Sequence, residues 1–210
     1  VGEGKMRIVK ICGLTNFEDA SFAVECGADF IGFVFAESPR RVTPEKAFEI
    51  LKALPEWVVS VGVFANEPLE RVEEMSRFLR LSYVQLHGSE SREYAEALSV
   101  PFIKAFKAKD ESVLDEIKSF GVEMFILDSY ASDRLGGTGK RLDFCLAQKA
   151  ARLGKMILAG GLTPDNVAEA GRRVNPFGVD VSSGVEFSVG RKDYQKLKRF
   201  VEEVRRCEKK

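Results

Sequence analysis

Metal-binding and disulfide-forming side chains are scarce in this sequence, which has one histidine and four cysteines among 210 residues. The cysteines form no Cys-x-x-Cys pair and no cluster with the histidine, so the sequence indicates neither a zinc site nor a disulfide framework. We therefore expect no bound metal and four free thiols. These are Cys12, Cys26, Cys145 and Cys207.

The chain also lacks long apolar runs and an excess of either charge. No run approaches the roughly 18 to 20 apolar residues of a membrane-spanning helix, and residues 1–10 lack the apolar core of a signal peptide. The 32 basic residues balance 32 acidic ones, which gives no electrostatic reason to expect a nucleic acid or an anionic membrane as partner. We expect a cytoplasmic protein that acts on a small molecule. Met6 is a candidate natural start, which would make residues 1–5 an extension.

No linker or low-complexity segment divides the chain. Short β-branched or aromatic runs alternate with stretches of helical spacing, and eight such units fill the sequence, which predicts one domain over residues 1–210. The eight runs are RIVKI (7–11), FIGFVF (30–35), VVSVGVF (58–64), YVQL (83–86), FIKAF (102–106), MFILD (124–128), MILA (156–159) and GVDV (178–181).

Helix starts are marked at three places. Thr15 with Glu18 resembles a capping box, and Thr43 and Thr163 each precede a proline that suits the first helical position. The last stretch, residues 191–208, is strongly charged but carries an apolar face, so we expect a final helix that packs against the first unit. That face consists of Leu197, Phe200, Val201 and Val204.

Eight strand-helix units fit either a closed (β/α)8 barrel or an open doubly wound sheet. A dinucleotide-binding sheet would show G-x-G-x-x-G after its first strand, whereas this chain has CGLTNFEDA there (12–20). Its glycine-rich turns come after the seventh and eighth strands, where barrel enzymes commonly bind phosphate. We predict a single α/β (β/α)8 TIM barrel that binds phosphate through backbone amides. The expected amides are those of Gly160, Gly161, Ser182, Ser183 and Gly184.

Between Lys10 and Glu186, a series of motifs occurs in order: KICGLT, FVF followed by SPRR, VGVF, VQLHG, LD followed by GGTG, LAGGL and GVDVSSGVE. In this combination the chain resembles the phosphoribosylanthranilate isomerases of tryptophan biosynthesis. The resemblance implies an Amadori rearrangement of N-(5'-phosphoribosyl)anthranilate without a cofactor. This reaction needs an acid to open the ribosylamine ring and a base to remove the C2 proton.

By resemblance, Cys12 matches the base and Asp128 matches the acid. Each is the first reactive group after an apolar run, as expected at the C-terminal ends of barrel strands. The alternative for Cys12 is a small core residue, and for Asp128 it is a residue that starts a loop. We read the other three cysteines as inert, because no acid, base or ligand spacing surrounds them.

Four further residues have expected positions at the site. Arg40 in SPRR matches the family arginine that pairs with the anthranilate carboxylate, a task suited to a bidentate donor. His87 falls at the end of the fourth strand, either in the active-site mouth or as a turn residue bonded to the backbone. Alternation puts Lys10 on the side of Cys12, and closure brings the eighth strand beside the first, so we expect Lys10 to pair with Asp180.

At neutral pH both proton-transfer groups are mostly in the wrong form. A free cysteine has a pKa of about 8.5 and is mostly a thiol, and a free aspartate has a pKa of about 3.9 and is mostly a carboxylate. We expect the charge of Lys10 to lower the pKa of Cys12. An apolar mouth would favour the neutral form of Asp128. Candidate covers for that mouth are Leu135, Leu142 and Phe144.

Other functions fit parts of the sequence. Within enzymes, the alternative is another phosphosugar barrel of the indole-glycerol-phosphate synthase or pentose-phosphate epimerase type, although a single histidine argues against a metal-dependent epimerase. From a different class, the chain could be a barrel that binds phosphorylated ligands without catalysis. The expected assembly is a monomer or a homodimer.

Overall fold

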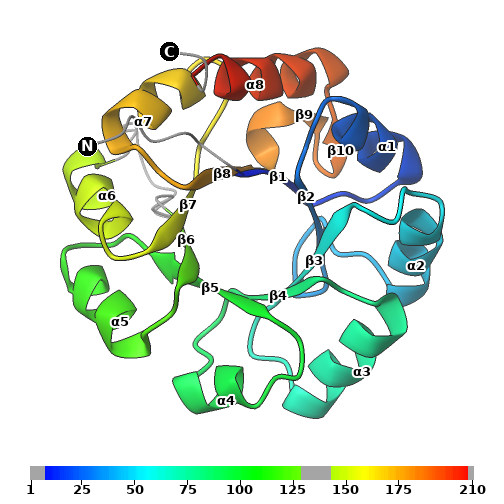
Figure 1. Ribbon diagram of the computed structural model, residues 1–210. Helices are drawn as coiled ribbons and strands as arrows, with labels where there is room; N and C mark the ends of the chain where they lie inside the picture. Colours follow the sequence, from blue (N-terminus) through cyan, green and yellow to red (C-terminus); the bar gives the residue numbers. More distant parts are fainter. Residues whose placement is uncertain (1–7, 129–142, 208–210) are drawn as a thin grey trace.

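Eight parallel strands close into one barrel in the computed structural model, which describes residues 8–128 and 143–207 (Figure 1). The strands follow one another around the ring in chain order, and the last pairs with the first, as predicted. They are β1 (Ile8–Cys12), β2 (Phe30–Val34), β3 (Val59–Phe64), β4 (Tyr83–Leu86), β5 (Phe102–Lys107), β6 (Met124–Asp128), β7 (Lys155–Ala159) and β8 (Gly178–Val181). Each coincides with one of the eight predicted runs, within one residue at either end.

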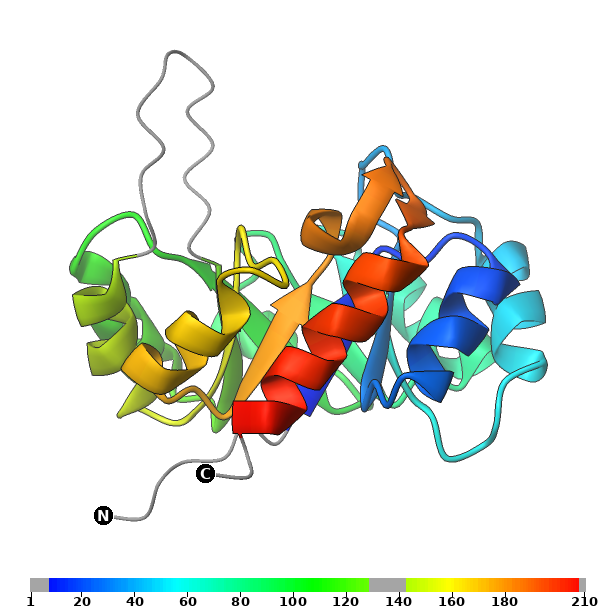
Figure 2. The same ribbon diagram turned by 90° about the horizontal axis from the view of Figure 1, so that it is seen from above.

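Helices surround the barrel as an outer ring (Figure 1). They are α1 (Phe17–Glu25), α2 (Pro44–Lys52), α3 (Leu69–Leu79), α4 (Arg92–Glu96), α5 (Ser112–Phe120), α6 (Phe144–Ala151), α7 (Val167–Val174) and α8 (Tyr194–Cys207). Between β8 and α8 the chain adds a short 3-10 turn, η1 (Ser183–Val185), and a hairpin of β9 (Glu186–Ser188) and β10 (Arg191–Lys192). Figure 2 shows this hairpin at one face of the barrel and the C-terminal end of α8 at the opposite face.

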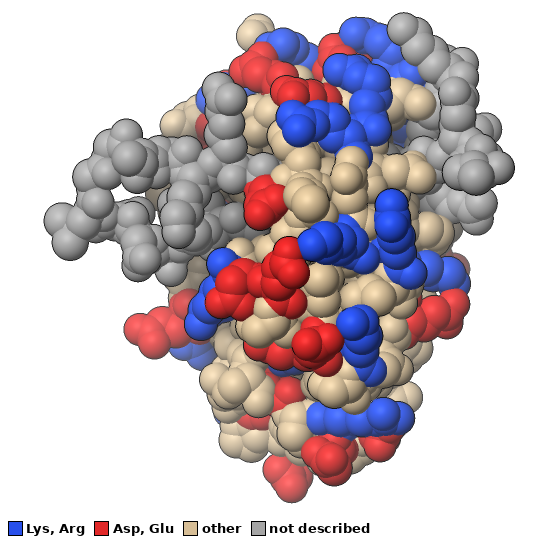
Figure 3. Space-filling model, turned by 90° about the vertical axis from the view of Figure 1, so that its left-hand side faces the viewer, with Lys and Arg blue, Asp and Glu red and all other residues tan. Residues whose placement is uncertain are grey.

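The outer surface mixes charges of both signs. Figure 3 shows Lys and Arg interspersed with Asp and Glu on the side where α5 and α6 lie in Figure 1. Some pairs connect different elements: Lys149 of α6 pairs with Glu111 before α5 at 2.6 Å, and Arg199 of α8 pairs with Asp165 before α7 at 2.7 Å. Exposed pairs of this kind contribute little to stability.

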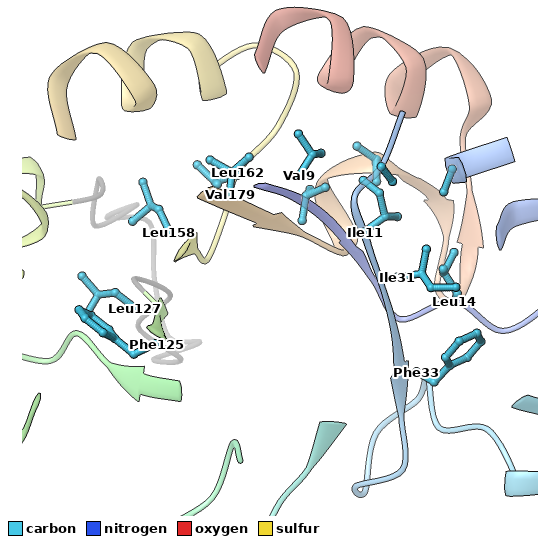
Figure 4. Close-up of a cluster of buried hydrophobic side chains, with 14 of the residues drawn as sticks. Val9, Ile11, Leu14, Ile31, Phe33, Phe125, Leu127, Leu158, Leu162 and Val179 are labelled. Atoms are coloured by element: carbon cyan, nitrogen blue, oxygen red, sulfur yellow. The ribbon is translucent and has the colours of Figure 1, made fainter. Parts of the chain in front are cut away.

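Two apolar layers follow from the alternation of side chains along the strands. One layer fills the barrel interior and consists of Ile8, Phe30, Val61, Ile103, Ala105, Ile126, Ile157 and Ala159. The larger layer lies between strands and helices, and in Figure 4 Val9, Val179 and Leu162 of this layer face α7 and α8. The final helix buries its predicted apolar face and lies beside α7 and α1. No helix in the described part of the chain is long and apolar enough to cross a membrane.

Of the three predicted helix starts, only the one at Thr43 is confirmed. Thr43 accepts a hydrogen bond from Lys46 N, and Pro44 opens α2. The capping box at Thr15 is wrong, because Asn16 caps α1 and Thr15 donates its hydroxyl to the carbonyl of Gly190 in the β9–β10 hairpin.

The start predicted at Thr163-Pro164 is also wrong, since α7 begins at Val167. Residues 163–166 instead form a turn closed by the side chain of Asn166. Its Oδ1 accepts from Thr163 N at 2.7 Å, and its Nδ2 donates to Gly161 O at 2.9 Å. This turn fixes the glycine-rich loop after β7, so the local sequence serves the loop rather than the helix.

The fully buried Phe200 of α8 gives a test of the outer layer. We expect Phe200→Ala to reduce the free energy of unfolding by about 3–5 kcal/mol, because the truncation leaves a cavity that a packed interior fills only in part. Urea denaturation measures the change. Phe187→Ala, at a residue that is 68% exposed, is the matched control and should change stability little. Equal effects of both substitutions would contradict the packing described for α8.

Candidate active site

The predicted site residues gather at one end of the barrel, because parallel strands bring their C-terminal ends to the same face. Cys12 and Asp128 end β1 and β6, and Asp180 lies in β8. Arg40 and His87 stand in the loops that follow β2 and β4. Around the ring, β1 and β6 are separated by β7 and β8. The thiol and the carboxylate therefore approach the mouth from different sides.

On the β1 side, Lys10 and Cys12 face the barrel interior, as alternation predicts. Lys10 is fully buried, and its Nζ lies 3.1 Å from Asp180 Oδ1, which confirms the expected pair. Gly32 of β2 stands beside Cys12 in the strand register. A Cβ at Gly32 would lie 2.8 Å from Cys12 Sγ and 3.2 Å from Lys10 Nζ. Glycine is therefore needed there to leave room for both reactive atoms.

The ionisation of this cluster differs from the expectation in one respect. Burial raises the pKa of Cys12, and the nearby charge of Lys10 lowers it only in part, so the net change is upward. The expected decrease is wrong because the thiol is 8% exposed and loses more hydration than one cation restores. For Lys10, burial lowers the pKa, but Asp180 and Cys12 raise it by more. The net change is upward, so the lysine stays charged.

On the β6 side, the side chains are more open to solvent. His87 Nε2 lies 3.5 Å from Asp128 Oδ2, with 31% and 23% of the two side chains exposed. Gln85 Nε2 lies 2.9 Å from His87 Nδ1. Sequence reasoning missed Gln85, although its position two residues before His87 on a strand places both on one side. The ring of His87 therefore lies beside Asp128 at the end of β6, and its role in the site stays a prediction.

Arg40 does not stand alone in its loop. Its guanidinium makes two hydrogen bonds to Glu186, Nε to Oε1 at 2.8 Å and Nη2 to Oε2 at 2.7 Å. Glu186 also pairs with the buried Lys192 of β10. Sequence reasoning missed both Glu186 and Lys192, because residues in a hairpin outside the repeating units carry no periodic signal.

The glycine-rich loops after β7 and β8 lie against each other. Gly160 and Gly161 have φ angles of 88° and 67°, which other residues rarely adopt. A Cβ at Gly184 would lie 1.8 Å from the carbonyl oxygen of Leu162. The backbone of the two loops therefore approaches as closely as glycine permits, next to Ser182 and Ser183 at the end of β8.

The remaining predicted groups lie partly inside and partly outside the described residues. All four cysteines are free, as expected. Within residues 8–128 and 143–207, no group of three or more His, Cys, Asp or Glu residues could hold a metal ion. Leu135 and Leu142, two candidate covers of the mouth, lie outside the described residues. The third candidate, Phe144, packs against the outer apolar layer instead of covering the mouth. Arg173 Cζ lies over the ring of Phe144, 3.8 Å from the ring centroid.

Comparisons with known proteins agree with this geometry. The family model described as N-(5'-phosphoribosyl)anthranilate (PRA) isomerase matches residues 9–203. The N-(5'-phosphoribosyl)anthranilate isomerase of Geobacter metallireducens is 49% identical over 194 residues, which cover 92% of this chain and 96% of that protein.

Solved structures give the same result. The phosphoribosyl anthranilate isomerase of Thermotoga maritima superposes with a TM-score of 0.89 at 40% identity, over 95% of this chain and 99% of that one. A structure of such an isomerase in complex with reduced 1-(o-carboxyphenylamino)-1-deoxyribulose 5-phosphate gives 0.86 at 38% identity, with the same coverage. The chain therefore belongs to the N-(5'-phosphoribosyl)anthranilate isomerases, the isomerases of tryptophan biosynthesis.

Proposed function

We propose that this isomerase opens the ribosylamine ring with Asp128 as the acid and isomerises the opened chain with Cys12 as the base. The observation that carries the proposal is the placement of the two groups at the same barrel mouth, at the ends of β1 and β6. A sugar lying across the mouth can meet one group on each side. Asp128 protonates the ring oxygen as the C1–O bond breaks, which leaves a Schiff base between C1 and the anthranilate nitrogen.

Cys12 then removes the C2 proton, and the electron pair moves into the C1–C2 bond to give an enolamine. Loss of the C2 hydroxyl proton and protonation of C1 complete the aminoketose. Because burial raises the pKa of Cys12, its thiolate is a minor form at neutral pH. A higher pKa also makes the thiolate a stronger base. The positive charge of Lys10 lowers the free energy needed to form it.

His87 supports Asp128 through its Nε2. Gln85 lies 2.9 Å from the other ring nitrogen, Nδ1, and orients the ring so that Nε2 faces Asp128. After Asp128 has given up its proton, an N–H at Nε2 can donate to the resulting carboxylate. His87 thus stabilises the conjugate base of the acid without taking the proton itself.

The substrate's two charged ends have separate places in the proposal. The anthranilate carboxylate pairs with Arg40, whose planar fork suits a carboxylate. The phosphate lies on the amides of Gly160, Gly161, Ser182, Ser183 and Gly184, where two loops converge. One relative binds reduced 1-(o-carboxyphenylamino)-1-deoxyribulose 5-phosphate, the reduced form of the aminoketose product, which supports this class of ligand. We refer to this compound as the reduced product. No cofactor takes part. A cytoplasmic location and a monomeric or homodimeric state stay predictions.

Replacing the proton-transfer groups tests their roles. We expect Cys12→Ser and Asp128→Asn each to lower kcat at least about 100-fold, the usual scale for general acid or base catalysis, while the reduced product still binds. A coupled spectroscopic assay and calorimetry measure the two quantities. Cys145→Ser, at an exposed thiol of α6, is the control and should leave both unchanged. Near-normal turnover in Asp128→Asn would transfer the acid's role to His87.

The raised pKa of Cys12 predicts a pH dependence. The base works as the thiolate, and below the pKa of Cys12 the thiolate fraction rises about tenfold per pH unit. The ultraviolet absorbance of the thiolate, with Cys12→Ser as the blank, should therefore increase only above neutral pH. Lys10→Met removes a cation and should move this titration curve to higher pH. A thiolate already formed at neutral pH would disprove this ionisation scheme.

A further inference from the structure

Three charged side chains from two separate loops meet beside the end of β1. Arg40 comes from the loop after β2, whereas Glu186 and Lys192 come from the hairpin after β8. Glu186 binds Arg40 through both carboxylate oxygens, at 2.8 Å and 2.7 Å, and its side chain is only 6% exposed. A buried carboxylate held this way restricts the arginine to one orientation.

Lys192 holds the carboxylate in turn. Its side chain is fully buried, and its Nζ donates to Glu186 Oε1 at 3.1 Å, Cys12 O at 2.8 Å and Ser182 O at 3.1 Å. These three acceptors match the three donors of an ammonium group. Because Cys12 and Ser182 follow the ends of β1 and β8, Lys192 fixes Glu186 to the barrel itself. A second bond, from Lys192 N to Asp19 Oδ2 at 2.9 Å, fixes the hairpin to α1.

The ionisation of Glu186 agrees with this role. Burial by itself would raise the pKa of Glu186, but the hydrogen bonds from Arg40 and the charge of Lys192 outweigh it and hold that pKa below its usual value. Glu186 is therefore a carboxylate at neutral pH. Burial lowers the pKa of Lys192, and Glu186 offsets this only in part.

The geometry also decides which edge of Arg40 remains. Glu186 occupies Nε and one N–H of Nη2, so within the described residues the edge formed by Nη1 and the other N–H of Nη2 is left for a second carboxylate. The stem of Arg40 passes close to Gly13, where a Cβ would lie 2.7 Å from Arg40 Cδ. Glycine at position 13 thus leaves room for the stem, and Glu186 constrains the guanidinium before a ligand arrives.

We infer that Glu186, held by Lys192, is a positioning residue that presents this remaining edge of Arg40 to the anthranilate carboxylate. The inference rests on the proposed role of Arg40 as the carboxylate-binding residue. Preorganisation of this kind strengthens binding because the ordering of the arginine precedes the encounter with the ligand. It acts on the carboxylate end of the substrate and not on its sugar or phosphate.

Two ligands separate positioning from general support of the fold. One is the reduced product with its carboxyl group, and the other is the same compound with a phenyl group in place of the carboxyphenyl group. The ratio of their dissociation constants, measured by calorimetry, is the carboxylate preference. We expect Glu186→Gln to lower this preference at least about tenfold and to leave the affinity for the phenyl compound within about twofold. In the enzyme assay, KM should rise more than kcat falls.

Arg40 variants connect the effect to the arginine. Arg40→Leu should lower the preference, and adding Glu186→Gln to it should cause no further loss, since the two side chains act as one unit. Glu96→Gln is the matched control: Glu96 accepts from Arg92 Nε at 2.7 Å on the exposed face of α4, and its loss should change neither affinity.

Several results would overturn the inference. If Glu186→Gln weakens both ligands equally, the residue has only a structural role. If Arg40→Leu loses the preference but Glu186→Gln keeps it, the positioning role fails while the proposed role of Arg40 stands. If Arg40→Leu keeps the preference, both fail. Should Glu186→Gln not fold, Glu186→Asp retains the charge but is too short for both bonds, and a full preference in that variant would also overturn the inference.

Discussion

The pairing of β8 with β1 is the contact on which the rest of the molecule depends. It closes the ring, and its register places Lys10 directly opposite Asp180. The two residues therefore meet inside the barrel as a buried ion pair. Such a pair gains little over apolar residues in stability, but losing one partner leaves an uncompensated charge in the interior. The pair thus favours one register of the closing strands over its neighbours, since a shift would separate the charges.

The contact between β1 and β8, which we call the seam, also places the chemical groups of the site. Cys12 follows Lys10 by two residues, and Ser182 follows Asp180 by two, so the thiol and the loop after β8 are placed by the register that pairs the charges. Lys192 Nζ donates hydrogen bonds to the carbonyl oxygens of both Cys12 and Ser182. A hairpin that lies outside the eight repeating units is in this way attached to the seam. Arg40, which comes from another loop, is bound to the seam through Glu186.

Much of this arrangement could be predicted from the sequence, and the exceptions share a cause. Strand positions, the inward direction of Lys10 and its pairing with Asp180 follow from alternation and closure, which are properties of local pattern. The predictions at Thr15 and Thr163 are wrong because Gly190 and Asn166 bind these residues through loop contacts that the local pattern does not show. The upward shift in the pKa of Cys12 depends on how completely the barrel buries the thiol, which no local pattern gives.

The two sides of the mouth differ in their access to water, and the proposed proton transfers explain why both can work. An isomerisation consumes no net proton, so each group must recover its starting state. Asp128 and His87 are partly exposed, so the acid can regain a proton from solvent or from the C2 hydroxyl. Cys12 is nearly enclosed, and its proton has the adjacent C1 carbon of the substrate as the closest acceptor. An enclosed base next to fixed charges and a more open acid next to an imidazole thus suit the two halves of one rearrangement.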